Sequence, residues 1–115
     1  MMKWNELNNL QQLGQLLEDS HDRKVVIFKH STRCSISRAA LDRLERHWKQ
    51  EELGGVQPYF LDLLSYREIS RQIQDVLSIE HESPQLIVIS KGAAVYHRSH
   101  FAIDYQDLKQ QLLKN

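Results

Sequence analysis

The stretch KVVIFKHSTRCSIS, residues 24–37, joins an apolar run to a polar segment that contains the only cysteine of the chain, Cys34. The first seven residues form a short, continuous run rich in β-branched side chains, which favours a strand buried on both faces. Beyond Cys34, apolar side chains recur at helical spacing at Ile36, Ala40, Leu41, Leu44 and Trp48. The stretch therefore predicts a strand that ends just before Cys34 and a helix that begins just after it.

The segments on either side of this junction continue the alternation of helical and extended patterns. Leucines at helical spacing over residues 10–17 predict a first helix, with Asn8 and Gln11 as its N-terminal cap. Residues 56–64 predict a second strand, and Pro58 should lie at its start or at a bulge because proline donates no ladder hydrogen bond. The sequence LGG before this strand marks the exit from the second helix.

The C-terminal half adds a helix, a hairpin and a final helix. Ser65 and Glu68 form a capping-box pattern ahead of an apolar stripe at residues 69–77. Residues 85–97 predict two strands joined at Lys91-Gly92. Asp104 is placed to cap the last helix, over residues 105–112.

The element order is therefore αβαβαββα. Strands separated by helices predict parallel neighbours, and the closing hairpin adds an antiparallel pair. We expect an α/β fold with a mixed four-stranded sheet flanked by helices, and a single domain over residues 1–115, because this length is typical of one domain.

Composition excludes several classes of protein. With 15 basic and 15 acidic side chains the formal net charge is zero, which gives no case for binding nucleic acid or an acidic membrane surface. One cysteine cannot form an internal disulfide, so a disulfide scaffold is excluded. The N-terminal residues lack the apolar region of a signal peptide, and the apolar runs are too short to span a bilayer. We therefore expect a cytoplasmic protein.

The position of Cys34 predicts a reactive thiol. Ligands in open α/β sheets collect at strand ends of this kind, and the N–H groups and dipole of a helix N-terminus stabilise a thiolate relative to a thiol. Thr32, Arg33, Ser35 and Ser37 supply a cation and hydroxyl groups nearby. The alternative for Thr32 and the neighbouring serines is a capping role, and the alternative for Cys34 is an inert core residue.

Cys34 and Ser37 form a C-x-x-S pattern. In a C-x-x-C redox helix the second cysteine attacks the mixed disulfide formed by the first. The Ser37 hydroxyl can hydrogen-bond a thiolate but cannot carry out that exchange, so an adduct on Cys34 would need an external thiol for its release.

The stretch IFKHSTRCSIS, the downstream SPQLIVI and the element order resemble the monothiol bacilliredoxin family, over about residues 4–113. The resemblance implies a thioredoxin-like fold and removal of a low-molecular-weight thiol, bacillithiol, from mixed disulfides on client proteins. It implies that Cys34 is the nucleophile, that Pro84 is the cis-proline of the family, and that Ser83 and Pro84 bind substrate beside the thiol. The alternative for Pro84 is an ordinary turn proline before a strand, with a trans peptide bond. It implies no bound cofactor and no metal, the thiol being a co-substrate.

Two positions depart from the family motif Thr-Cys-Pro-Ile-Ser. Arg33 stands in place of the threonine and Ser35 in place of the proline. Ser35 restores an N–H group in the first helical turn that could point at the sulfur. The departures leave open which small thiol is the co-substrate.

Three other functions share some of these sequence features. A non-catalytic module of the same fold would dock an extended segment beside Ser83-Pro84 and would not need Cys34. A C-x-x-S protein can also hold an iron–sulfur cluster between two subunits, although nothing else in the sequence promotes it. The histidines lack metal-ligand spacing, and His30, four residues before Cys34, lacks the partners that a cysteine–histidine hydrolase requires.

Overall fold

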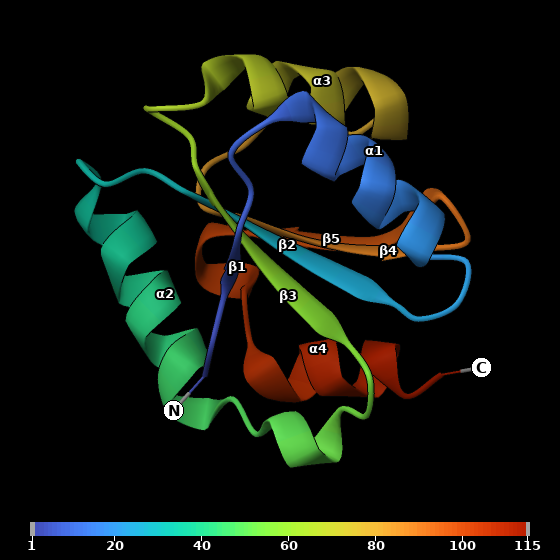
Figure 1. Ribbon diagram of the computed structural model, residues 1–115. Coiled ribbons are helices and arrows are strands. Elements are labelled where there is room, and N and C mark those ends of the chain that lie inside the picture. The colour runs from blue at the N-terminus through green and yellow to red at the C-terminus, as the bar shows by residue number, and fades with distance from the viewer. Residues whose placement is uncertain (1, 115) are drawn as a thin grey trace.

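The computed structural model describes residues 2–114, and its centre is a five-stranded mixed sheet in the order β1-β3-β2-β4-β5. Helices cover both faces of this sheet (Figure 1). The strands are β1 (Asn5–Glu6), β2 (Val25–His30), β3 (Gln57–Asp62), β4 (Gln85–Ser90) and β5 (Ala93–Ser99). The α-helices are α1 (Leu10–Asp19), α2 (Ser35–His47), α3 (Arg67–Leu77) and α4 (Tyr105–Leu112), and two short 3₁₀ helices are η1 (Gln50–Glu52) and η2 (His100–Ala102).

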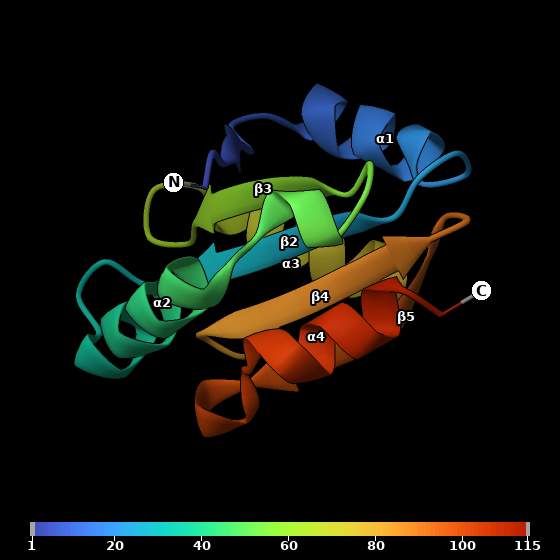
Figure 2. The ribbon, with the colours of Figure 1, turned by 90° about the horizontal axis from the view of Figure 1, so that it is seen from below.

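The sheet separates two hydrophobic cores. Val25 and Ile27 of β2 pack on the side of α1 and α3, whereas Val26 and Phe28 pack on the side of α2 and α4. Figure 2, the view from below, has α4 in front of the sheet and α3 behind it. Because successive side chains of a strand point to opposite faces, a central strand with a core on each side must be apolar at nearly every position. The prediction that the run before Cys34 is buried on both faces is confirmed.

The sheet topology corrects two predictions. Strands β2 and β3 are parallel as expected, but β4 pairs antiparallel with β2, although helix α3 precedes it. The sheet also has five strands and not four, because β1 adds to β3 at one edge. The side chains of Asn5 and Glu6 in β1 are both exposed, so this two-residue strand has no apolar alternation by which the sequence could reveal it.

The helix ends differ from the predicted ones by small shifts. Helix α1 is capped by Asn9 and Gln12 in a full capping box, one residue later than predicted. Helix α3 begins after Tyr66, and the Ser65 hydroxyl donates to Asp62 and does not cap the helix, so the predicted Ser65–Glu68 box is wrong. Asp104 caps α4 by accepting from the Asp107 N–H, as predicted.

The hairpin between β4 and β5 turns at the predicted dipeptide. Lys91 and Gly92 both have positive φ angles, 54° and 77°, which is the combination that a two-residue turn of matching twist requires. The turn is held to the end of α1, because the Lys91 and Gly92 N–H groups donate to the carbonyl and hydroxyl oxygens of Ser20. Within residues 2–114, no helix has the length and apolar character needed to cross a bilayer.

Candidate functional site

Cys34 occupies the N-cap position of α2, directly beyond the end of β2. Its N–H donates to the Ser31 carbonyl at 3.1 Å, and its own carbonyl accepts from the Arg38 N–H at 3.1 Å, the first hydrogen bond of the helix. The thiol is free and half-buried, and no acidic side chain lies in the first helical turn. The thiol therefore lies at the N-terminus of α2, where the Cys34 side chain makes no capping hydrogen bond.

A buried hydrogen-bond network anchors this first turn to β2. The Ser37 hydroxyl lies 2.7 Å from His30 Nδ1 and accepts from the Ser31 N–H at 3.1 Å. Both side chains are buried, with Ser37 at 0% and His30 at 1% exposure. Burial, followed by the positive charge of Arg38, lowers the pKa of His30, so its ring is neutral at pH 7 and Nδ1 can accept the hydroxyl proton.

The geometry gives Ser37 a role that its place in the C-x-x-S pattern did not predict. The pattern allowed its hydroxyl to bond to the sulfur or to cap the helix, but in residues 2–114 its partners are His30 and the Ser31 N–H. The sequence offered no signal for this, since a serine three residues into a helix normally faces solvent. Ser37 is therefore a positioning residue that joins β2 to the start of α2.

The other side chains predicted to surround the thiolate lie at the surface. Thr32, Arg33 and Ser35 are all exposed, on either side of Cys34 in the chain. Arg33 takes part in neither of the two ion pairs found among the described residues. These three side chains are therefore in contact with solvent. Their effect on the Cys34 sulfur stays a prediction.

Ser83 and Pro84 lie beside this site. Lys29 of β2 pairs with Gln85 of β4 in antiparallel register, so the next residues of the two strands, His30 and Pro84, lie together at the same end of the sheet. The Ser83-Pro84 peptide bond is cis, as expected. Pro84 is buried, and its carbonyl accepts from the His100 N–H at 3.2 Å. Strand β4 begins at Gln85, so Ser83 is not part of its hydrogen-bonded pairing with the neighbouring strands.

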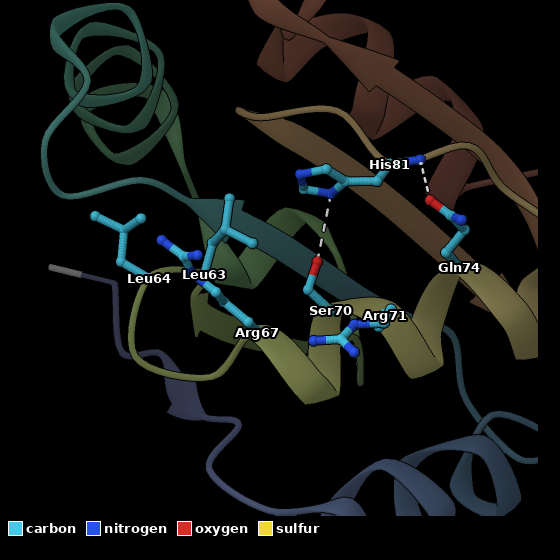
Figure 3. Close-up of a pocket in the computed structure, with 7 residues that line it drawn as sticks. All are labelled: Leu63, Leu64, Arg67, Ser70, Arg71, Gln74 and His81. Carbon is cyan, nitrogen blue, oxygen red and sulfur yellow. Dashed lines mark hydrogen bonds between the residues drawn. The ribbon is translucent and has the colours of Figure 1, made fainter.

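A pocket of about 390 Å³ opens on the α3 side of the same end of the sheet. Figure 3 shows its lining, which comes from the loop after β3, from α3 and from the loop before β4. The lining residues are Leu63, Leu64, Arg67, Ser70, Arg71, Gln74 and His81. This pocket could not be predicted from the sequence, because its residues are distributed over two loops and one helix face.

Lys29 lies behind the pocket wall. Its side chain is fully buried, and its Nζ lies 3.3 Å from His81 Nδ1, which is also 3.3 Å from the Ser70 hydroxyl. Burial lowers the pKa of Lys29 to about 8. The available sequence signal was a lysine inside a run predicted to be buried on both faces, since buried lysines are rare without a partner.

No metal site emerges from the described part of the chain. Within residues 2–114, histidine, cysteine and carboxylate side chains form no group of three that could hold an ion.

Comparisons with known proteins agree with this geometry. A solved structure described as an oxidoreductase with a thioredoxin fold is 28% identical, with a TM-score of 0.80 over 95% of this chain and 92% of that chain. The thioredoxin of Fasciola hepatica is 18% identical, with a TM-score of 0.71 over 94% and 95% of the two chains. The thioredoxin of Malassezia sympodialis is 15% identical, with a TM-score of 0.75 over 97% and 90%.

The structural likeness confirms the predicted thioredoxin-like fold. A sequence model of one family, monothiol bacilliredoxin BrxC, matches residues 5–108, which include Cys34, Ser37 and Pro84. The expected resemblance is thereby confirmed, together with a role in thiol–disulfide redox chemistry. The chain belongs to the monothiol bacilliredoxin family.

Proposed function

We propose that this protein is a monothiol oxidoreductase that removes a low-molecular-weight thiol, bacillithiol, from mixed disulfides on client proteins of the cytoplasm. The observation that carries the proposal is the position of Cys34, a free, half-buried thiol at the N-cap of a 13-residue helix. Ser37 stands where a second cysteine would stand, and it is occupied by hydrogen bonds to β2. The chemistry must therefore run through one sulfur of this chain.

The first step is attack of the Cys34 thiolate on the small-thiol sulfur of a client mixed disulfide. The bond between the two sulfurs of the client disulfide breaks, the client leaves as a thiolate, and a disulfide forms between Cys34 and the small thiol. This attack takes place at the N-terminus of α2, where Cys34 is the N-cap residue. In the second step a further small thiol, as its thiolate, attacks the adduct, which releases the small-molecule disulfide and regenerates the Cys34 thiolate.

The surface around Cys34 supports binding of a protein client. Ile36, two residues beyond the thiol, is 42% exposed, and Phe101 in η2 is 82% exposed. Helix η2 contacts α2, and the His100 N–H donates to the Pro84 carbonyl, which places Phe101 on the same part of the surface. Exposed apolar side chains of this size are typical of protein contact sites. We propose that Ser83 and Pro84 contact the client chain while these two side chains pack against it.

The experiment is intact-mass spectrometry during exchange. The reduced protein is mixed with a client protein carrying a bacillithiol mixed disulfide, and samples are quenched with acid. We expect the mass of one bacillithiol to appear on the wild-type protein, and the adduct to disappear on addition of free bacillithiol. Cys34→Ser should form no adduct while retaining its circular dichroism spectrum and melting temperature within a few degrees.

The same samples separate this function from a non-catalytic binding module. A client that binds Cys34→Ala as tightly as the wild-type protein, with no adduct on the wild-type protein at any time, would favour the binding module. A client released in its reduced form at the rate at which the adduct appears would favour the oxidoreductase.

A further inference from the structure

The pocket beside α3 collects positive charge. Arg67 and Arg71 lie one helical turn apart on α3, and His81 faces them from the loop before β4 (Figure 3). No carboxylate side chain is among the lining residues. In residues 2–114 only two ion pairs form, Arg98–Asp107 and Lys109–Glu52, so both pocket arginines are without an acidic partner.

Lys29 adds a buried cation behind His81. An ammonium group has only hydrogen-bond donors, so the 3.3 Å contact requires His81 Nδ1 to accept. The Ser70 hydroxyl, also 3.3 Å away, donates to the same nitrogen. Burial, followed by the charge of Lys29, lowers the pKa of His81, and the ring is neutral at pH 7. Its single N–H is therefore at Nε2 and is free to donate to a bound group.

Two acidic side chains near the pocket in the sequence, Glu82 and Asp62, have other partners, whereas Glu68 and Asp75 of α3 take part in neither ion pair of residues 2–114. Glu82, next to His81, accepts from the Ser99 hydroxyl at 2.6 Å. Asp62, at the end of β3, accepts from the Leu64 N–H and the Ser65 hydroxyl. The guanidinium groups and the imidazole Nε2–H of the pocket are therefore the donors available to a ligand with negative charge.

The pocket and the thiol share one end of the sheet. The Leu63 N–H donates to the His30 carbonyl at 2.9 Å, and His30 is four residues before Cys34. Strands β2 and β3 are parallel, so the loops that follow them leave the sheet at the same end. Both views of the ribbon show this (Figure 1 and Figure 2). A volume of about 390 Å³ is within the range of pockets that hold small molecules.

We propose that this pocket binds the carboxylate-bearing part of the small thiol and so directs its sulfur toward Cys34. In this arrangement Arg67, Arg71 and His81 donate to the carboxylates, and Lys29 contributes charge from behind. The inference rests on the proposed thiol exchange and adds the residues of this chain that recognise the small thiol, so that exchange favours thiols with carboxylates over neutral or cationic thiols.

The test uses three simple thiols. Cys34 is first loaded with 2-mercaptoethanol as a mixed disulfide, and its release is timed by intact mass with mercaptosuccinate, 2-mercaptoethanol or cysteamine. Each variant rate is divided by the wild-type rate for the same thiol, which removes differences in intrinsic thiol reactivity. For Arg71→Gln and Arg67→Gln we expect the mercaptosuccinate rate to fall at least about fivefold, with the other two rates nearly unchanged. Arg46→Gln, on the exposed side of α2, removes the same charge and should change no rate.

A second measurement reports binding without thiol chemistry. Titration of the wild-type protein with succinate should shift the amide signals of α3 residues in NMR spectra, and Arg71→Gln should weaken that response. Exchange with all three thiols that responds equally to Arg71→Gln and Arg46→Gln would overturn the pocket assignment and leave the proposed function standing. Failure of the wild-type protein to form any Cys34 adduct would overturn the proposed function, and the assignment with it.

Discussion

The Ser37 hydroxyl lies 2.7 Å from His30 Nδ1, inside the molecule, at the point where β2 gives way to α2. The same hydroxyl accepts from the Ser31 N–H at 3.1 Å. One small side chain thus holds the last residue of the strand, the loop and the first turn of the helix together. Because Cys34 lies within this loop and turn, its position depends on a hydrogen bond made three residues away.

Replacing Ser37 by alanine should therefore affect both stability and exchange. The variant leaves a buried imidazole nitrogen and a backbone N–H without partners, which costs about 1–3 kcal/mol of unfolding free energy. A shift of the first turn should also slow adduct formation on Cys34. Urea denaturation and the mass-spectrometric exchange assay measure the two effects. Ser35→Ala, which removes an exposed hydroxyl in the same turn, is the control for stability and should leave the free energy of unfolding unchanged. Equal behaviour of the two variants would contradict the positioning role.

The sequence was sufficient for the central elements and for the position of Cys34 between a strand and a helix, and the reasons are local. An apolar run of fixed length before Cys34 and helical spacing after it specify a strand and a helix without reference to the rest of the chain. Strand β1 could not be predicted, because Asn5 and Glu6 have exposed side chains without apolar alternation, and the strand depends on its pairing with the distant β3. The antiparallel direction of β4 likewise depends on tertiary packing and has no signal in the helix that precedes it.

The candidate site also contains residues that could be predicted from the sequence and residues that could not. Cys34 and Pro84 were predicted because each stands at a recognisable boundary. The partner of Ser37 and the pocket formed by Arg67, Arg71 and His81 could not be, because they depend on which side chains meet across elements. Lys29 was visible as a charge in a buried strand, but its neighbour His81 lies 52 residues away in the sequence.

Phe101 should matter to protein clients and not to small thiols. It is 82% exposed in η2, which contacts both α2 and the carbonyl of Pro84 through its first residue. Phe101→Ser should lower the rate of exchange with a protein mixed disulfide by about three- to tenfold, the loss expected for one aromatic contact residue. Exchange with 2-hydroxyethyl disulfide should be unchanged. Leu113→Ser, another exposed apolar side chain, is the control. Equal losses with both disulfides would show that the side chain acts on the thiol and not on the client.

The buried imidazole of His30 predicts a loss of stability in mild acid. Its pKa in the folded protein is below the ordinary value of 6.5, mainly because of burial, so the unfolded chain takes up a proton first as the pH falls. The free energy of unfolding should therefore decrease from about pH 7 toward pH 5. The pKa of His81 is lowered in the same direction, so its contribution must be separated.

Two variants make that separation. Urea denaturation at pH 7, 6 and 5 should give a shallower pH dependence for both His30→Gln and His81→Gln than for the wild-type protein. His30→Gln should in addition lower stability at pH 7, because the buried partner of Ser37 is lost. A wild-type slope retained in both variants would mean that other groups cause the acid sensitivity.

The buried ammonium of Lys29 predicts a change in the free energy of unfolding at alkaline pH. Burial lowers its pKa from 10.5 to about 8, so between these values the unfolded chain binds more protons than the folded protein. The free energy of unfolding should accordingly rise between pH 8 and pH 9.5 through this group. Lys29→Met removes the ammonium and keeps the length of the side chain, so it should abolish this rise. Its stability at pH 7 should equal or exceed that of the wild-type protein, because a buried charge without a carboxylate partner is costly.

The measurement is urea denaturation at three pH values from 8 to 9.5, with Lys3→Met as a control that removes an exposed ammonium. Tyr59, Tyr96 and Tyr105 have raised pKa values in the folded protein and act in the opposite direction near pH 10. Their contribution is common to all three proteins, so the difference between Lys29→Met and the wild-type protein isolates Lys29. A Lys29→Met protein with the pH dependence of the Lys3→Met control would show that Lys29 reaches solvent, which would also remove the buried charge assigned to the α3 pocket.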